Sequence, residues 1–516
     1  MKRKRFYTAI YLLITTAFSF SQLLASAQQR PNIILIISDD HAYQSISAYG
    51  NKLMQTPNID RIAKEGVLFK KAYVTNSICG PSRATILTGK YSHKNGFKDN
   101  EISSYDGNQN TFIKELQKGG YQTAWVGKLH LDNKPQGFDF WQILPGQGSY
   151  YNPDFLMMKK KKKRIEGYAT NIIEDVAENW LDKRDTTKPF CLVIGHKATH
   201  RTWMPDTPDL GMFDKIVFPL PKNFYDNYTG RNAAAVQDMT IAKTMILGYD
   251  LKMFETKDAE DKEGSIKRMN GDQRKRFDSY DHRVYEGFKN QNLTGNALVE
   301  WKYQRYLRDY LSTAASLDRN IGRTLNYLDR HNLSNNTIVI YLSDQGFYLG
   351  EHGWFDKRFM YEESFRAPMV MRYPAVVKPG TVNNNMIMNL DIAPTLLDAA
   401  GVTAPADMQG ISFLPLVSTQ KVTGRKAMYY HYYENGEHSV SPHFGISTGR
   451  YKLIRFYKRV ESWELFDLHK DPTEMKNLYG NKKYRKITMK LKDELLQLIK
   501  QYEDLEAEKI FYQDID

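Results

Sequence analysis

The stretch Asn32-Ile33-Ile34-Leu35-Ile36-Ile37, followed at once by Ser38-Asp39-Asp40-His41, decides the expected fold. Its apolar residues run on without polar alternation and are mostly β-branched. This pattern is typical of a strand that is buried on both faces of a parallel sheet. Comparable apolar runs recur at residues 123–126, 190–194 and 337–342.

Helical patterns separate these runs, at residues 58–65, 111–118, 169–181 and 301–328. Strands that alternate with helices predict an α/β fold, here a large central, mostly parallel sheet flanked by helices. Ligands of such sheets bind at the carboxyl ends of the strands. Every candidate chemical residue named below follows one of the predicted strands closely, so we expect a single site at that edge.

The chain of 516 residues is too long for one average domain. Beyond residue 425, strands are expected at 427–433, 444–447, 451–457 and 463–467, before a helix at about 483–505. We therefore predict a signal peptide at 1–27, a catalytic domain at 28–424 and a smaller C-terminal subdomain, an antiparallel sheet plus helix, at 425–516. The polar segment 205–300 is expected to wrap the surface as an insertion.

The first residues are typical of an export signal. Lys2-Arg3-Lys4-Arg5 is a basic start, residues 6–20 form an apolar segment, and Ala25-Ser26-Ala27 is a small-residue cleavage site. The apolar segment is short for a membrane span, and no cysteine near the cleavage site could carry a lipid. These features predict a soluble exported protein without a stable membrane anchor.

Charge and cysteine content narrow the possible functions. The formal net charge is +13, partly from the signal and partly from the basic run 159–164, which is expected to be a solvated hairpin tip. Basic proteins attract polyanions. An exported protein without a recognised nucleic-acid motif fits sulfated glycans better than nucleic acid. Two cysteines rule out a disulfide scaffold: Cys191 lies in a buried-strand pattern, whereas Cys79 lies among small and polar residues.

Two acidic turns suggest a metal site. Asp39 and Asp40 follow the first strand, and Asp344 and Gln345 follow the strand at 337–342. Three carboxylates and an amide oxygen form an all-oxygen set that suits a hard cation such as Ca²⁺ or Mg²⁺ and not zinc. A lone pair of aspartates after a strand could also be a helix cap.

The segment Ser77-Ile78-Cys79-Gly80-Pro81-Ser82-Arg83-Ala84-Thr85-Ile86-Leu87-Thr88-Gly89 contains Cys-x-Pro-Ser-Arg and ends in Thr-Gly. It resembles the signature of the type I sulfatases, which belong to the alkaline phosphatase superfamily. The resemblance implies that a maturase oxidises Cys79 to formylglycine, whose hydrate attacks the sulfur of a sulfate ester. It also implies Ca²⁺ binding by Asp39, Asp40, Asp344, Gln345 and the modified residue 79.

The same resemblance implies roles for the remaining polar residues at the strand ends. Arg83 would hold the hydrate and the oxygens on the metal side, and Lys128 and Lys357 would bind the sulfate. His200 would protonate the leaving oxygen. His130 would be the base that collapses the sulfated hemiacetal and regenerates the aldehyde. Histidine suits such proton transfers because its unperturbed pKa is about 6.5.

The resemblance extends over nearly the whole mature chain. Residues 343–358 look like those of bacterial carbohydrate sulfatases. Residues 200–205 and 431–434 are most similar to exported N-acetylglucosamine-6-sulfatases of glycan-degrading bacteria. This implies a periplasmic or secreted enzyme of a Gram-negative bacterium that removes 6-O-sulfate from N-acetylglucosamine in heparan-type or mucin-type glycans. Arg201, His438 and His443 are candidate sugar-binding residues.

Three alternatives remain open at this point. The protein could act on another sulfate position of a sugar. It could hydrolyse phosphonate or phosphate esters, because related enzymes share the fold and a Cys-x-Pro-Ser-Arg turn. It could also bind sulfated glycans without catalysis. The presence of all the expected catalytic residues argues against this alternative: Cys79, Arg83, Lys128, His130 and His200.

Overall fold

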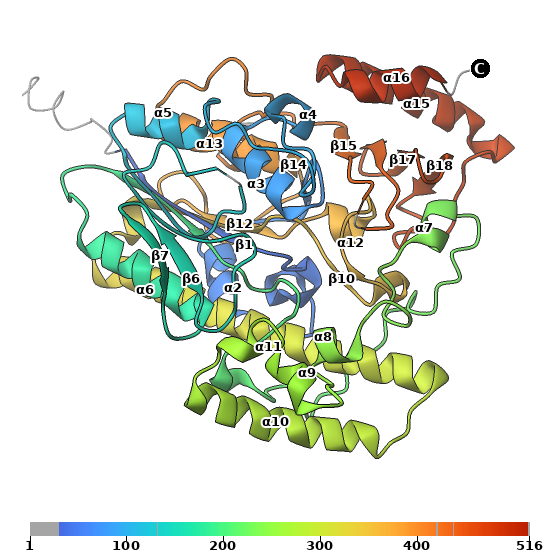
Figure 1. Ribbon diagram of the computed structural model, residues 1–516. Coiled ribbons are helices and arrows are strands. Elements are labelled where there is room, and N and C mark those ends of the chain that lie inside the picture. Colours follow the sequence, from blue (N-terminus) through green and yellow to red (C-terminus); the bar gives the residue numbers. More distant parts are fainter. Residues whose placement is uncertain (1–29, 132, 419–421, 437, 514–516) are drawn as a thin grey trace, which may run out of the picture.

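The structure is a computed structural model that describes residues 30–513 apart from 132, 419–421 and 437. The predicted signal peptide at 1–27 lies outside the described residues. A ten-stranded sheet forms the centre of the larger part (Figure 1). Its strand order is β13 (Thr381–Asn383), β2 (Val67–Phe69), β12 (Met369–Arg372), β9 (Thr337–Ser343), β1 (Asn32–Ser38), β8 (Phe190–Gly195), β4 (Gln122–Lys128), β5 (Phe140–Leu144), β6 (Asp154–Met157) and β7 (Lys160–Arg164).

The predicted central strand is confirmed. β1 pairs in parallel with β8 on one side and with β9 on the other, and all seven of its residues are buried. β4 pairs in parallel with β8 and with β5, whereas β12, β6 and β7 add antiparallel pairs toward the edges. The carboxyl ends of β9, β1, β8 and β4 therefore lie next to each other along one edge of the sheet.

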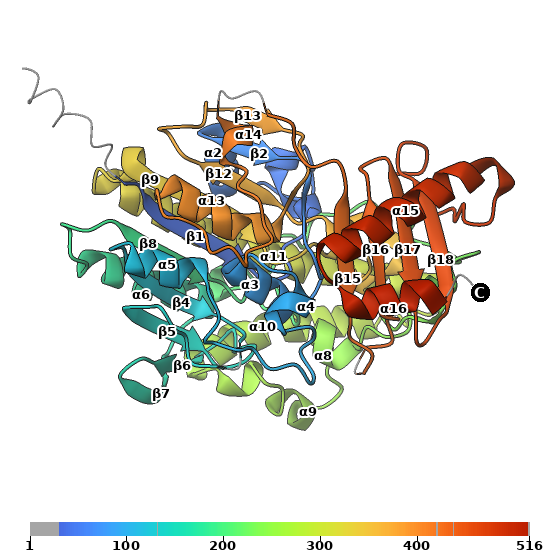
Figure 2. The same cartoon turned by 90° about the horizontal axis from the view of Figure 1, so that it is seen from above.

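The two faces of the sheet bury alternate residues of β1. Ile33, Leu35 and Ile37 belong to one core cluster, together with residues of three helices: α3 (Cys79–Thr88), α5 (Phe112–Lys118) and α13 (Ile392–Ala399). Ile34 and Ile36 belong to another, with residues of α2 (Pro57–Lys64), α6 (Ala169–Asp182) and α11 (Gly295–Arg330). This arrangement confirms the predicted α/β sheet with helices on both faces (Figure 2).

A smaller antiparallel sheet follows near the C-terminus, as predicted. It consists of β15 (Met428–Tyr432), β16 (His443–Ser447), β17 (Tyr451–Phe456) and β18 (Ser462–Asp467). The helix predicted at about 483–505 is confirmed as α15 (Arg485–Gln501), but it is not the last, because α16 (Leu505–Gln513) follows. Glu503 between them has φ +59°, which a continuing helix cannot accommodate, and the Asp504 carboxylate accepts from Ala507 N at 3.1 Å in the first turn of α16. The domain boundary at 424/425 stays a prediction.

The polar segment 205–300 contains no strand among its described residues. Its helices include α8 (Leu247–Leu251), α9 (Lys257–Asp261) and α10 (Gly271–Lys289), which lie beside α11 at the outside of the molecule (Figure 1). Most of the basic run 159–164 forms the edge strand β7 of a hairpin, and its turn lies at 158–159. Among the described helices, none is both long and apolar enough to cross a membrane.

Two glycines bring the ends of β4 and β8 unusually close. Gly127 and Gly195 are paired across the two strands. A Cβ on Gly127 would lie 2.1 Å from Gly195 O, and a Cβ on Gly195 would lie 2.1 Å from Lys128 O. Gly127 also has φ +91°. The residues at this edge of the sheet can approach each other because neither glycine carries a side chain.

We expect Gly127→Ala to destabilise the fold by about 2–4 kcal/mol, because it combines a clash with backbone atoms and a strained φ. The matched control is Gly50→Ala. Gly50 has a similar φ of +87° but has no atom within 4 Å of the added Cβ, so it should lose only about 1 kcal/mol. Equilibrium denaturation of both variants measures the difference, and equal losses would contradict a role for the close approach.

Candidate active site

Cys79 is the first residue of α3, directly after the extended residue Ile78. Its side chain is buried, with the whole residue 1 % exposed. Two carboxamides donate toward its Sγ: Asn100 Nδ2 at 3.4 Å and Gln147 Nε2 at 3.9 Å. Burial raises the pKa of the Cys79 thiol. The nearby ammonium groups of Lys128 and Lys357 lower it by more than burial raises it, so the net shift of this pKa is downward.

Arg83 lies one helical turn after Cys79, as its spacing predicts, and is fully buried. Its Nε donates to Asp344 Oδ2 at 2.8 Å, its Nη1 to the carbonyl of Lys128 at 2.8 Å, and its Nη2 to the carbonyl of Ser38 at 3.4 Å. One guanidinium therefore contacts the ends of β1 and β4 and the turn after β9.

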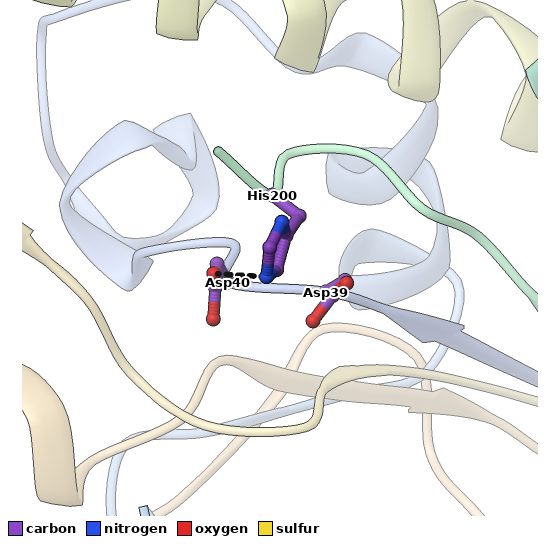
Figure 3. A group of neighbouring side chains, drawn as sticks. All are labelled: Asp39, Asp40 and His200. Carbon is purple, nitrogen blue, oxygen red and sulfur yellow. Dashed lines mark ion pairs between the residues drawn. The ribbon is translucent and has the colours of Figure 1, made fainter. Parts of the chain in front are cut away.

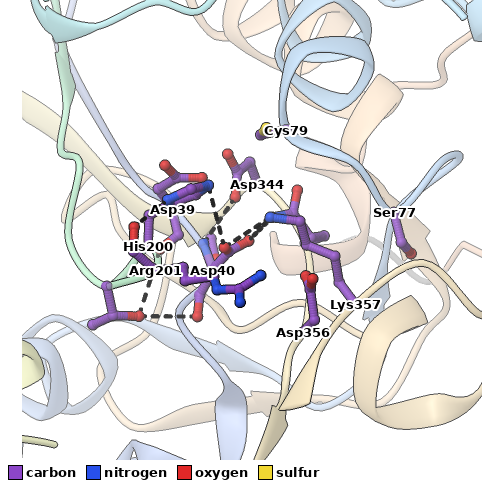
Figure 4. Close-up of polar contacts among 12 residues, drawn as sticks. Asp39, Asp40, Ser77, Cys79, His200, Arg201, Asp344, Asp356 and Lys357 are labelled. Carbon is purple, nitrogen blue, oxygen red and sulfur yellow. Dashed lines mark hydrogen bonds and ion pairs between the residues drawn. The ribbon is translucent and has the colours of Figure 1, made fainter. Parts of the chain in front are cut away.

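The residues of the two acidic turns meet at the same place, as predicted. The backbone N of Asp40 donates to Asp344 Oδ1 at 3.2 Å, and Gln345 Nε2 donates to Asp40 Oδ1. Lys357 Nζ donates to both carboxylate oxygens of Asp40, at 2.6 and 2.7 Å (Figure 4). Lys128 forms an ion pair with Asp39. The polar groups of β1, β4, β9 and the following loops thus form one buried cluster.

The three carboxylates are in strongly unequal environments. For Asp39, burial raises the pKa, but Lys128, His200 and Arg83 together bring it well below its usual range. For Asp40, burial and the neighbouring Asp39 charge outweigh Lys357 and raise the pKa to about 7. Burial also raises the pKa of Asp344, since Arg83 opposes the effect only in part. A bound cation would favour the ionised form of all three.

These residues fit a hard cation. Asp39 Oδ1 and Gln345 Oε1 are buried and have no hydrogen-bond partner among the described residues. Buried polar atoms without partners are uncommon, and each needs an explanation. The converging donors are carboxylate and amide oxygens, which Ca²⁺ and Mg²⁺ prefer. Figure 3 shows the His200 ring between the carboxylates of Asp39 and Asp40, which follow the end of β1.

The two candidate catalytic histidines have different neighbours. His200 Nδ1 donates to the carbonyl of Arg201 at 2.7 Å, and its Nε2 lies 3.9 Å from Asp40 Oδ2. His130 Nε2 lies 3.3 Å from Gln147 Nε2. Burial lowers the pKa of both, for His130 to about 3 with a contribution from Lys128. His130 is therefore neutral and able to accept a proton.

The predicted sugar-binding residues differ in position. Arg201 lies beside His200, keeps 28 % of its side chain exposed, and pairs with both oxygens of Asp250 at 2.5 and 2.9 Å. His438 is partly exposed and its Nδ1 lies 3.1 Å from Glu434 Oε2. His443 is fully buried in β16.

The geometry does not support a sugar contact by His443. Its Nδ1 donates to the carbonyl of Ser441 at 2.8 Å, and its Nε2 accepts from the backbone N of Met360 at 3.0 Å. Both ring nitrogens are therefore already used by backbone groups, one just before β16 and one in the segment before α12 (Glu362–Phe365). Sequence alone gave no indication of which face of this strand the histidine occupies.

Five polar residues of the site are not among those predicted from the sequence. Asp356 and Arg358 flank Lys357 and form an ion pair at 2.6 Å; both have a positive φ, +86° and +97°. Lys197 is buried against the ring of Tyr150, and burial lowers its pKa to about 7, with Lys128 adding to the effect. Asn100 and Gln147 are the other two. For Gln147 the sequence offers only Gly146-Gln147-Gly148, an ordinary turn sequence that follows β5, a strand not among those predicted.

Comparison with known proteins agrees with this geometry. Residues 31–402 match the family model described as Sulfatase, and residues 350–501 match the model described as N-sulphoglucosamine sulphohydrolase, C-terminal. The chain is 50 % identical over 491 residues to an N-acetylglucosamine-6-O-sulfatase of Bacteroides thetaiotaomicron, covering 92 % of this chain and 87 % of that protein.

Two solved structures resemble this one in fold. A protein solved in complex with its substrate D-glucosamine-2-N,6-O-disulfate superposes with a TM-score of 0.90 at 48 % identity, covering 92 % of this chain and 99 % of that one. The phosphonate monoester hydrolase of Agrobacterium radiobacter shares the fold, with a TM-score of 0.68 at 20 % identity over 92 % of this chain and 96 % of that one. With its site geometry and these matches, the chain belongs to the sulfatase family of sulfuric ester hydrolases.

Proposed function

We propose that this protein hydrolyses the 6-O-sulfate ester of N-acetylglucosamine in sulfated glycans of heparan or mucin type. The observation that carries the proposal is the convergence of Cys79, two lysines, two histidines and an all-oxygen carboxylate set at one edge of the sheet. The identity of 50 % to an N-acetylglucosamine-6-O-sulfatase supports the choice of sugar and position.

The nucleophile in this proposal is residue 79 after oxidation of Cys79 to formylglycine by a maturase. The hydrated aldehyde supplies a hydroxyl that attacks the sulfur of the ester. The start of α3 suits this role, because the carboxamides of Asn100 and Gln147 already donate toward the side chain of residue 79. Arg83, one turn later, would orient the hydrate from the side of Asp344.

Lys128 and Lys357 are the proposed sulfate-binding residues. Both are almost fully buried, and both are close enough to Cys79 for their charges to lower the pKa of its thiol. Asp40 and Cys79 raise the pKa of Lys357 despite its burial, so it keeps its charge. Ammonium groups that are fixed in a buried site stabilise the charge of the transferring sulfate more strongly than they would in water.

His200 and His130 would move protons at two different oxygens. His200 keeps Nδ1 bonded to a carbonyl and turns Nε2 toward the acidic cluster, so its imidazolium form could donate to the leaving sugar oxygen. A bound sulfate would favour that charged form, because an opposite charge nearby raises the pKa of an imidazole. His130, kept neutral by burial and Lys128, would accept a proton from residue 79.

The cation in this proposal is Ca²⁺, held by Asp39, Asp40, Asp344, Gln345 and residue 79. The unpartnered oxygens Asp39 Oδ1 and Gln345 Oε1 support the assignment. The ion would offset the carboxylate charges and polarise a sulfate oxygen.

We propose that residues around this cluster recognise the sugar. Arg201 and His438 are partly exposed and remain candidates. We add Asp356, which is also partly exposed and forms an ion pair with the buried Arg358 on the other side of Lys357. A carboxylate and a guanidinium side by side can accept from and donate to neighbouring hydroxyl groups of a sugar ring.

The proposed location is outside the inner membrane, in the periplasm or medium of a Gram-negative bacterium. The support is the basic, apolar and small-residue pattern of residues 1–27. The proposed partners are the maturase and the sulfated carbohydrate, without nucleic acid and without a stable membrane anchor.

The first expected result is that Cys79→Ala abolishes turnover of every sulfate ester while circular dichroism stays that of the wild type. The reason is that the variant has no residue to oxidise. Cys79→Ser should also be inactive unless the host oxidises serine. Turnover by Cys79→Ala at more than a few per cent of wild type would contradict the proposed nucleophile.

Removal of the metal should remove activity, and Ca²⁺ should restore it. We expect Asp39→Asn, Asp40→Asn and Asp344→Asn to weaken Ca²⁺ binding in calorimetric titrations, since each removes a carboxylate from a hard-cation site. A surface variant, Asp272→Asn, is the control and should bind like the wild type. Full activity of the chelated protein would show that the assignment is wrong.

His200→Ala should affect a sugar sulfate more than an aryl sulfate. A sugar alkoxide is a poor leaving group and needs a proton, and general acid catalysis supplies about 10²–10⁴-fold. We expect a loss of that order on N-acetylglucosamine-6-sulfate and a clearly smaller one on 4-nitrophenyl sulfate.

Equal losses on the two substrates would mean that His200 binds sulfate and does not donate a proton. Wild-type activity at another sulfate position but not at O6 would refute the substrate proposal alone and leave the sulfatase chemistry intact.

A further inference from the structure

Gln147 lies in a short turn that follows β5, the strand next to β4. Its neighbours Gly146 and Gly148 have φ values of +53° and +67°. Gly148 N donates to Pro145 O at 3.0 Å, and a Cβ on Gly148 would lie 2.8 Å from Leu144 Cδ1. The backbone of this turn is thus defined by close packing, which fixes where the Gln147 side chain starts.

The carboxamide of Gln147 contacts three of the proposed catalytic groups. Its Oε1 accepts from Lys128 Nζ, and its Nε2 lies 3.3 Å from His130 Nε2 and 3.9 Å from Cys79 Sγ. Asn100, the other carboxamide at the site, donates toward Cys79 Sγ but forms no hydrogen bond with Lys128 or His130. Gln147 therefore links the sulfate-binding lysine, the proposed base and the nucleophile position.

Hydrogen-bond chemistry fixes the orientation of this carboxamide. Lys128 is an ammonium with donors and no acceptor, so the group that faces it must be the amide oxygen. The amide nitrogen must then face His130. Because an amide N–H can only donate, the Nε2 atom of His130 has to accept, and the proton of the neutral ring has to be on Nδ1.

We propose that Gln147 is a positioning residue that holds His130 in the Nδ1–H tautomer, with the unprotonated Nε2 facing the amide nitrogen that also lies 3.9 Å from Cys79 Sγ. The proposal deepens the proposed function and rests on it for the role of His130 as the base. A base at Nε2 must be unprotonated there, and Gln147, whose amide oxygen accepts from Lys128, selects the tautomer in which it is. The hydrogen bond from Gln147 gives way when Nε2 takes up a proton.

The tautomer can be measured on the unoxidised Cys79 protein, independently of activity. Two-bond ¹H–¹⁵N correlation spectra of the ¹⁵N-histidine-labelled protein distinguish protonated from unprotonated ring nitrogens, and His130→Gln assigns the resonances by their loss. We expect wild-type His130 to be protonated at Nδ1 and unprotonated at Nε2. A proton on Nε2 in the wild type would overturn the proposal.

Gln147→Glu is the decisive variant because it reverses one hydrogen bond at nearly constant shape. A carboxylate can only accept, so His130 should become protonated at Nε2. Gln147→Met, which offers no hydrogen bond, should give a mixture of tautomers. Asn100→Leu is the matched control: it removes a carboxamide from residue 79 and should leave the His130 signals unchanged. Unchanged His130 signals in Gln147→Glu would also overturn the proposal.

Kinetics on N-acetylglucosamine-6-sulfate then connect the tautomer to turnover. Loss of an effective base is worth about 10²–10⁴-fold, so kcat of Gln147→Glu should fall by at least about 10²-fold. The expected tautomer shift without any fall in kcat would overturn the link to catalysis. An oxidised wild type that is inert toward all sulfate esters, but shows the expected tautomer, would refute the proposed function and leave the positioning of His130 standing.

Discussion

The buried guanidinium of Arg83 is the interaction on which the site depends. It is fully buried, and its Nε donates to the Asp344 carboxylate. Through the carbonyls of Ser38 and Lys128 it joins the ends of two strands that are separated by β8 in the sheet. Removing one member of a buried ion pair typically costs about 3–5 kcal/mol, because the other charge is left uncompensated. Arg83 is also on the helix that begins at Cys79, so the same contact sets the position of Cys79, the precursor of the proposed nucleophile, relative to the acidic turns.

Charge balance explains why so many ionisable groups can be buried together. Asp39 pairs with Lys128, Asp40 with Lys357, and Asp344 with Arg83, and all six side chains are almost inaccessible to solvent. This arrangement suits an anionic substrate, because the cations that we propose bind sulfate are already held in place by carboxylates. The unpartnered oxygens of Asp39 and Gln345 add the capacity for a hard cation, which matches the all-oxygen chemistry of the cluster.

The central sheet and the clustering of polar residues at its strand ends could be predicted from the sequence, because both follow from strong local patterns. The apolar run at 32–37 specified a strand buried on both faces, and the residues at the strand ends could be placed together without knowing any contact. Side-chain direction and loop geometry could not be predicted in this way. His443 proved to be buried against Phe359 and Met360, the predicted C-terminal helix ended early and a left-handed residue, Glu503, separates it from a further helix, and Gln147 was missed because Gly-Gln-Gly is an ordinary turn sequence. Each depends on tertiary packing that the local sequence does not encode.

The central claim is that Cys79 is a precursor of the nucleophile and not a packed thiol like Cys191. Mass spectrometry of the proteolytic peptide bearing residue 79, from protein made in a host with an active maturase, tests it most directly. Oxidation to formylglycine predicts a defined loss of mass, together with reaction of the peptide with a hydrazine reagent; the peptide bearing Cys191 serves as the internal control and should keep its thiol. A residue 79 that remains an unmodified cysteine in fully active protein would contradict the account.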